Sequence, residues 1–187
     1  MEYEITRMSR KSLARFDNDA ASCFDRIIPN VGALASRSFG VHDSVATVSA
    51  YTLQDAKYCL KTQLGITTEL YSHCRMYPIY GTGQGSGNLP IIWLFIGSVL
   101  FDCHNSVAKG AIFETPDKSL SVQLSMTGYV DDNTGQTNNF TIGAQQTVRE
   151  VRDNMRNDAQ AWGDLLAVTG QALELSKCSF NHLHYDF

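Results

Sequence analysis

The sequence predicts an α+β fold in which a small antiparallel sheet is backed by helices. Three observations indicate this fold class: segments in which apolar and polar residues alternate, a long segment in which apolar residues recur every three or four positions, and the mixed order of the two kinds along the chain. Of the 187 residues, 43% are apolar, which is enough for a hydrophobic core. No repeat and no linker rich in proline, glycine or serine divides the chain, so we expect one unit.

The first third of the chain is expected to hold a strand and a helix. Residues 12–19 predict a strand in which Ala14 and Phe16 face a core, while the charged residues share the other face. These charged residues are Arg15, Asp17 and Asp19. Asp43 or Ser44 can cap a helix with a long apolar stripe. The stripe, which Gly65 ends, consists of Val45, Val48, Thr52, Ala56, Leu60 and Leu64.

The rest of the chain predicts two more strands and two more helices. The strands cover residues 76–80 and 120–127, the second with clear alternation. An apolar helix begins at about Leu89, with Pro90 tolerated in its first turn. Its apolar run of thirteen residues is shorter than the ~20 needed to cross a membrane, so we expect a core helix. A long helix ended by Gly170 carries Ala144, Val148, Val151, Met155, Ala159, Trp162 and Leu166 on one face.

Charge and cysteine content exclude several classes of protein. Fifteen Lys and Arg against nineteen Asp and Glu give a net charge of -4, which argues against a histone-like partner of nucleic acid. The five cysteines are odd in number and form no CxxC pair, which favours a reduced compartment. The N-terminus has no apolar run behind its charges, and no segment is long enough to span a membrane. We therefore expect an intracellular protein, in the cytoplasm or the nucleus.

Two acidic segments are candidates for chemistry. Asp17, Asp19 and Asp25 surround Phe24, although such a cluster is also typical of a helix start. The second segment, Tyr129-Val130-Asp131-Asp132, follows the alternating strand, and adjacent aspartates are often turn formers. Carboxylates that converge from separate strands need a cation, and Mg²⁺ prefers such hard oxygen ligands.

The glycine run over residues 81–87 is the third candidate. It is expected between a strand and a helix, as a dinucleotide-binding loop would be, but the third glycine of that pattern is missing and no G-K-S/T of a P-loop is present. Glycines without side chains still let a backbone approach a flat or phosphate-bearing ligand closely.

Taken together, these segments resemble motifs A, B and C of reverse transcriptases, and are most similar to those of non-LTR (LINE-type) retrotransposon polymerases. Motif A corresponds to Asp19 with Phe24 and Asp25, motif B to Gly81-Thr82-Gly83-Gln84-Gly85 with Pro90, and motif C to Tyr129-Val130-Asp131-Asp132. Residues 170–178, with Lys177, resemble motif D. The resemblance covers roughly residues 12–180 in the family's order.

The resemblance implies the palm domain of an RNA-directed DNA polymerase that adds deoxynucleotides to a primer by two-metal-ion catalysis. Asp19, Asp131 and Asp132 would hold two Mg²⁺ ions, with Mn²⁺ as a substitute, and Lys177 would protonate the leaving pyrophosphate. Phe24, Gln84, Gly85 and Tyr129 would contact the substrate. The expected partners are an RNA template, a DNA or RNA primer and a dNTP, with no membrane.

Residues 1–187 would form a palm fragment from which the fingers and thumb are largely absent, so we expect those segments in the same or a neighbouring reading frame. Asp17 competes with Asp19 for the metal role, and the spacing to Phe24 favours Asp19. Two other functions stay open: an inactive palm remnant that binds nucleic acid or protein, and a dinucleotide-binding enzyme. Cys178, His182 and His184 lack a fourth ligand at a known zinc spacing, which favours a plain strand.

Overall fold

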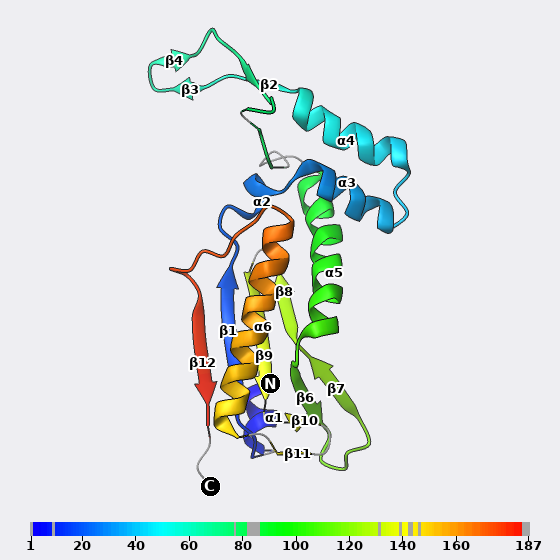
Figure 1. Ribbon diagram of the computed structural model, residues 1–187, viewed down its shortest axis with the longest axis vertical. Helices are drawn as coiled ribbons and strands as arrows, with labels where there is room; N and C mark the ends of the chain where they lie inside the picture. The colour runs from blue at the N-terminus through cyan, green and yellow to red at the C-terminus, as the bar shows by residue number, and fades with distance from the viewer. Residues whose placement is uncertain are drawn as a thin grey trace. The chain divides into compact units, whose positions relative to one another are not determined.

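The chain folds into two compact units of mixed α and β structure (Figure 1). The computed structural model describes residues 2–8, 10–76, 78–81, 87–130, 132–138, 140–141, 144–145 and 147–184. The first unit comprises Met1–Ala21 and Leu100–Phe187, and the second comprises Ser22–Val99. The predicted α+β class is confirmed. That residues 1–187 form a single palm domain stays a prediction.

Four strands of the first unit form one antiparallel sheet: β1 (Leu13–Asp19), β8 (Met126–Tyr129), β9 (Asp132–Asn138) and β12 (Ser179–Leu183). Their order across the sheet is β12-β1-β9-β8 (Figure 1). The strand predicted over residues 12–19 is confirmed as β1, whose Ala14 and Phe16 are buried while Arg15, Asp17 and Asp19 are half-buried on the other face. The remaining elements of this unit are α1 (Glu2–Met8), the last turns of α5 (Leu89–Val107), β6 (Ala111–Glu114), β7 (Ser121–Leu124), β10 (Phe140–Thr141), β11 (Ala144–Gln145) and α6 (Val148–Val168).

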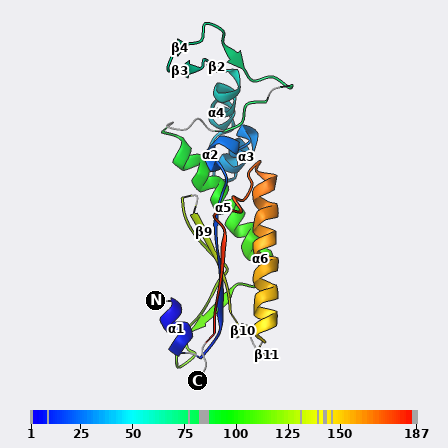
Figure 2. The same ribbon diagram turned by 90° about the vertical axis from the view of Figure 1, so that its left-hand side faces the viewer.

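The long helix α6 packs on one face of this sheet, and α1 lies on the other (Figure 2). Thr147 and Glu150 form a capping box at the start of α6, and Gly170, with φ +90°, lies just beyond its end. Trp162 is fully buried, and its Nε1 donates a 2.9 Å hydrogen bond to Oδ1 of Asn18. The predicted apolar face is confirmed from Val151 to Leu166, but Ala144 belongs to β11.

Gly135 on β9 makes room for the ring of Phe16 on β1, which pairs with it across the sheet. A Cβ atom at Gly135 would lie 2.0 Å from two ring carbons of Phe16. We expect Gly135→Ala to lower the free energy of unfolding by about 1–3 kcal/mol, because overpacking forces the ring or the backbone to shift. Urea denaturation would measure it. Phe16→Leu should relieve the clash, so the double variant should lose less free energy of unfolding than the two single variants together. A loss in the double variant equal to the sum of the two single losses would contradict this explanation.

The second unit consists of helices and a ribbon of short strands. Its elements are α2 (Cys23–Arg26), α3 (Pro29–Ser38), α4 (Asp43–Asp55), β2 (Lys57–Tyr58), β3 (Lys61–Thr62), β4 (Gly65–Ile66), β5 (Tyr71–Ser72) and the first turns of α5. Strand β2 pairs with β5, and β3 pairs with β4. Helices α3 and α4 pack on each other, and the rings of Phe39 and Phe95 stack at 5.0 Å between α3 and α5.

Three predicted elements differ from the structure. The helix expected to run to Gly65 ends at Asp55, and its N-cap is His42. The strand predicted over residues 120–127 is broken at Ser125, because its first half pairs with β6 and its second half with β9. No strand forms in the described part of residues 76–80, which omits Tyr77.

The apolar helix α5 is confirmed from Leu89, with Pro90 in its first turn. Among the described helices it is the one long and apolar enough to cross a membrane by length and composition. Its Trp93, Ile96, Leu100 and His104 are buried, and Phe101 stacks on Trp162 at 5.4 Å. Only 28% of its apolar window is buried, however, and Ile91 and Leu94 are exposed, so the expectation of a core helix stays a prediction.

Candidate active site

The first unit brings two of the predicted catalytic carboxylates together. Strand β1 pairs with β9 so that Asp19 lies directly opposite Asp132. Directly opposed residues of an antiparallel pair point to the same face with Cβ atoms about 4.5–5.5 Å apart, and like charges there are destabilising. This pair therefore favours a cation beside it.

A strained residue, Val130, precedes the third predicted carboxylate in the sequence. Tyr129 pairs with Asp132 across strands β8 and β9. Val130 has φ +57°, a conformation that a β-branched residue rarely adopts and that costs on the order of 1–3 kcal/mol. Asp131 lies outside the described residues, so its role stays a prediction. Strain of this kind is typical of positions that a fold holds for function.

Lys177 supplies a cation to this site. Its Nζ lies 2.5 Å from Oδ2 of Asp19, and the Asp19 side chain is 17% exposed whereas that of Lys177 is 65% exposed. Backbone hydrogen bonds hold this segment beside β1: Ala21 N donates to the Ala172 carbonyl at 2.8 Å, and Glu174 N donates to the Asp19 carbonyl at 2.9 Å. The segment predicted as motif D thus lies against the motif A strand.

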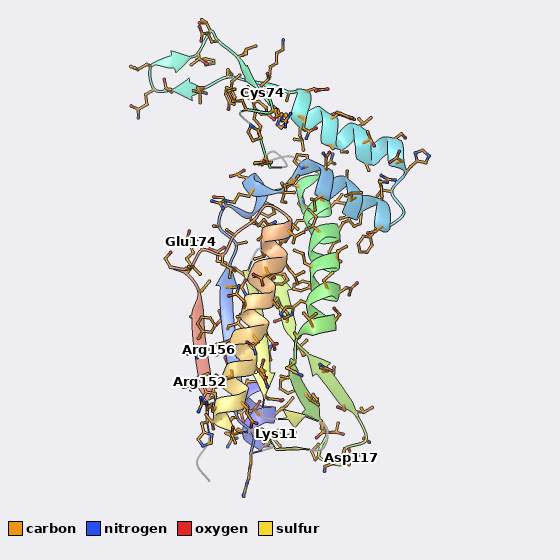
Figure 3. All side chains as sticks on the ribbon, in the orientation of Figure 1. Lys11, Cys74, Asp117, Arg152, Arg156 and Glu174 are labelled. Atoms are coloured by element: carbon orange, nitrogen blue, oxygen red, sulfur yellow. The ribbon has the colours of Figure 1, made fainter. Side chains whose placement is uncertain are left out.

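Glu174 adds negative charge at the same end of the sheet (Figure 3). Hydrogen bonds from the side chain and backbone of Ser176 hold the pKa of Glu174 below its usual value, although the nearby Asp19 charge opposes this shift. Glu174 is therefore ionised at neutral pH, and the segment from β1 to Lys177 carries a cluster of carboxylates with one lysine.

Asp17, two residues before Asp19 on the same face, has other partners. Its Oδ1 accepts hydrogen bonds from Arg15 Nε at 2.8 Å and from Thr134 Oγ1 at 2.7 Å. The hydroxyl of Ser179 approaches its other oxygen at 3.4 Å. These contacts tie Asp17 into the sheet. Asp19 is itself bound by Lys177, so the choice of Asp19 over Asp17 as a metal ligand stays a prediction.

The donor set fits Mg²⁺. Asp19 and Asp132 supply hard carboxylate oxygens from adjacent strands, and Mg²⁺ is typically held by one or two carboxylates together with substrate phosphates. Among the described residues, no group of three or more His, Cys, Asp or Glu side chains is placed to hold a metal. Two of the three predicted ligands are described, and Lys177 already balances one of them.

The predicted substrate residues that can be described lie in both units. Phe24, on α2 of the second unit, is half-buried and meets the ring of Trp93 edge to face at 6.2 Å. Tyr129, at the end of β8 in the first unit, is 80% exposed. Gln84 and Gly85 lie outside the described residues.

Gly81, the first glycine of motif B, approaches the protein's own backbone. It has φ +98°, and a Cβ there would lie 2.9 Å from Cα of Asp25. Its N–H donates to the Ile27 carbonyl at 2.8 Å. At Gly81 the glycine therefore lets the backbone approach the helix that carries Phe24, and a close approach to a ligand stays a prediction.

The first unit contains a buried polar network that the sequence did not predict. The Asp158 carboxylate, 3% exposed, accepts hydrogen bonds from Lys109 N at 3.0 Å, Gly110 N at 3.2 Å and Thr137 Oγ1 at 2.9 Å. The Asp158 carbonyl lies 3.0 Å from Nε2 of the fully buried His104. One signal was visible in the sequence: Asp158 occupies an apolar position, three residues after Met155 and four before Trp162.

Solved structures with a similar fold include telomerases, which are reverse-transcriptase-related enzymes. One, from Candida albicans in complex with a TWJ fragment of telomeric RNA, is 13% identical with a TM-score of 0.63, and the match covers 100% of this chain and 29% of that chain. Another, the apo telomerase of Candida tropicalis truncated from its C-terminal domain, is 12% identical with a TM-score of 0.60 and coverages of 99% and 34%.

The chain thus spans about a third of the length of these neighbours. No protein-family model matches the sequence, and neither does any curated protein. At these identities the likeness concerns the fold alone.

Proposed function

We propose that this chain is the catalytic palm of an RNA-directed DNA polymerase. The observation that carries the proposal is the pairing of Asp19 with Asp132 across two strands, with Lys177 bound to Asp19. The motifs support a relationship to non-LTR retrotransposon polymerases. The structural neighbours support RNA as a partner, because one of them is a telomerase in complex with telomeric RNA.

The proposed reaction is attack of a primer 3′-hydroxyl on the α-phosphate of a dNTP, with release of pyrophosphate. Two Mg²⁺ ions, when bound, would activate the hydroxyl and stabilise the charge on the triphosphate oxygens. Asp19, Asp131 and Asp132 would hold these ions, and the ammonium of Lys177 would give a proton to the leaving pyrophosphate. The ion pair supports this role, since it holds the Lys177 amine at Asp19, the carboxylate proposed to bind metal.

Primer extension tests this proposal. A polypeptide in which fingers and thumb segments accompany this chain should extend a primer on an RNA template with dNTPs, and chelation of divalent metal should stop it. The same polypeptide without measurable extension, although folded and bound to the primed template, would favour an inactive palm remnant.

Phe24 provides a test of sugar choice. In the family that the motifs resemble, this aromatic lies beneath the sugar of the incoming nucleotide, where a ring leaves no room for a 2′-hydroxyl. We expect Phe24→Ala to raise ribonucleotide incorporation strongly and to lower deoxynucleotide incorporation only modestly. The measurement is kcat/KM for both nucleotides, together with Tm.

Its edge-to-face contact with Trp93 gives Phe24 a packing role as well. Trp93→Leu removes that ring contact but keeps the Phe24 ring, so it serves as the control for packing. A ribo/deoxy ratio that is unchanged in Phe24→Ala, with a lowered Tm in both variants, would show that Phe24 only packs.

A further inference from the structure

A second surface of the first unit combines cations with exposed aromatic rings. Phe180 and His182 lie on β12 and share one face, since residues two apart in a strand point to the same side, and His184 directly follows the strand's last residue, Leu183. Phe180 is 58% exposed, and both histidines are exposed. The two imidazole rings lie nearly parallel, 6.3 Å apart with an interplanar angle of 11°. The edge strand therefore presents a row of flat rings.

The neighbouring helix α6 adds a row of arginines. Arg149, Arg152 and Arg156 are spaced by three and four residues, so they form one stripe about 10 Å long. All three are exposed, and Figure 3 places the labelled Arg152 and Arg156 along the side of α6 that runs beside β12. We call these six residues, which lie on β12, directly after it and on α6, the β12–α6 surface.

The cations of this surface repel each other. Burial, followed by the charges of His184 and Arg152, lowers the pKa of His182. Asp153 approaches Arg149 at 3.8 Å and Arg156 at 4.0 Å, both long contacts between exposed groups that contribute little. Within the part of the chain that the structure describes, Arg152 forms no ion pair with a carboxylate. A site with this arrangement favours an anion.

The position of the rings argues for a particular kind of anion. A single strand of nucleic acid exposes both its phosphates and the faces of its bases, and proteins hold it with a cationic groove beside aromatic side chains on which bases stack. Histidine rings can serve as such platforms. Arginine suits phosphate because its planar guanidinium binds two oxygens at once. An acidic peptide would use the arginines but not the rings.

We propose that the β12–α6 surface binds single-stranded nucleic acid, with phosphates on the arginine stripe and bases on the β12 rings. The surface is separate from the carboxylates: His182 pairs with Ala14 near the start of β1, whereas Asp19 ends that strand. Five residues at about 3.3 Å each place the two about 16 Å apart along the strand. This binding extends the proposed function, since a polymerase palm needs its carboxylates but not a second contact with a strand.

Fluorescence anisotropy with the whole chain tests this proposal, using labelled oligouridylate and oligothymidylate as probes. Arg152→Gln and His182→Ala should each weaken binding of a single strand by about tenfold or more, the effect typical of losing one phosphate or stacking contact. Arg152→Gln should also reduce the dependence of log K on log salt by about 0.7. Circular dichroism would show that both variants stay folded.

Arg37→Gln is the matched control, because Arg37 is an exposed arginine that pairs with Asp43 in the second unit. Binding within twofold of the parent in both surface variants, or an equal loss in Arg37→Gln, would overturn the proposal. Polyglutamate that competes as well as oligouridylate would also overturn it, since the rings would then contribute nothing. Equal binding of the two probes would show that the phosphates and bases are read without regard to the sugar.

The same probes separate this proposal from the polymerase activity. Asp19→Asn should leave binding at the β12–α6 surface unchanged even where it abolishes primer extension. If the protein extends primers but Arg152→Gln and His182→Ala do not weaken its binding of the single strand, the proposed β12–α6 binding site is wrong and the polymerase proposal stands. If the protein does not extend primers but both variants weaken binding, the polymerase proposal is wrong and the binding site stands.

Discussion

Primer extension is expected to fall by about a thousandfold or more when Asp19 is replaced by Asn, in a polypeptide that also carries fingers and thumb segments. An amide oxygen is a weaker ligand than a carboxylate for Mg²⁺, and the charge that remains on Asp132 cannot hold two ions. Asp19→Asn also removes the charge that binds Lys177. The measurement is kcat/KM for dNTP at saturating Mg²⁺. Asp131→Asn should have the same effect if the hairpin tip supplies a second ligand.

Asp17→Asn is the control for this experiment. Asp17 lies two residues away on the same face of β1, but its carboxylate is bound by Arg15 and Thr134. We expect Asp17→Asn to lower stability and to keep extension within tenfold of the parent. Near-parental activity in Asp19→Asn would contradict the role of Asp19 as a metal ligand. An equally large loss of activity in Asp17→Asn, with the Tm of both variants unchanged, would contradict the choice of Asp19 over Asp17.

A loss of about 3–5 kcal/mol in the free energy of unfolding is expected for Asp158→Ala. The substitution would leave the buried Gly110 N–H, the part-buried Lys109 N–H and the buried hydroxyl of Thr137 without their acceptor, at about 1–3 kcal/mol for each buried group. Urea denaturation, followed by far-UV circular dichroism, would measure the loss.

Asp153→Ala is the matched control on the same helix, since Asp153 is half exposed and makes only long contacts with arginines. Its effect should stay within about 0.5 kcal/mol. Asp158→Asn should fall between the two, because it keeps one oxygen acceptor but turns an amide toward N–H donors. A loss below about 1 kcal/mol in Asp158→Ala would show that water replaces the carboxylate.

Local patterns predicted the elements whose neighbours do not change along their length. Buried and half-buried residues alternate along β1 because α6 covers one face of the strand. Apolar residues recur every three or four positions in α6 because the helix stays on that face. The helix that begins at Asp43 shows the limit of such patterns. Leu60 and Leu64 continue its apolar spacing, yet they lie exposed in a ribbon that is closed by Tyr58 and Tyr71, whose rings stack at 5.4 Å. No local pattern reveals a partner thirteen residues away.

The residues of the candidate site could be predicted from the sequence, but the contacts among them could not. Alternation placed Asp19 on the polar face of its strand, and the motifs supplied Asp132 and Lys177. The contacts among them depend on strand pairings over more than a hundred residues, which the sequence does not display. Asp158 was missed for the opposite reason. A charged residue at an apolar position is normally taken as a break in the apolar face of a helix. The three hydrogen-bond donors to Asp158 come from two segments far away in the sequence, so no local pattern predicts them.

The strand order also determines when the sheet can form during synthesis. Among the described residues, strand β1 pairs with β9 and β12, which are made more than a hundred residues after it. The second unit is continuous from Ser22 to Val99, so it can fold as soon as it leaves the ribosome. Strand β1 must meanwhile wait with its hydrogen-bonding edges unpaired. Such non-local pairing slows folding and prolongs exposure to aggregation. The opposed carboxylates Asp19 and Asp132 therefore come together only when β9 closes against a strand that was made more than a hundred residues earlier.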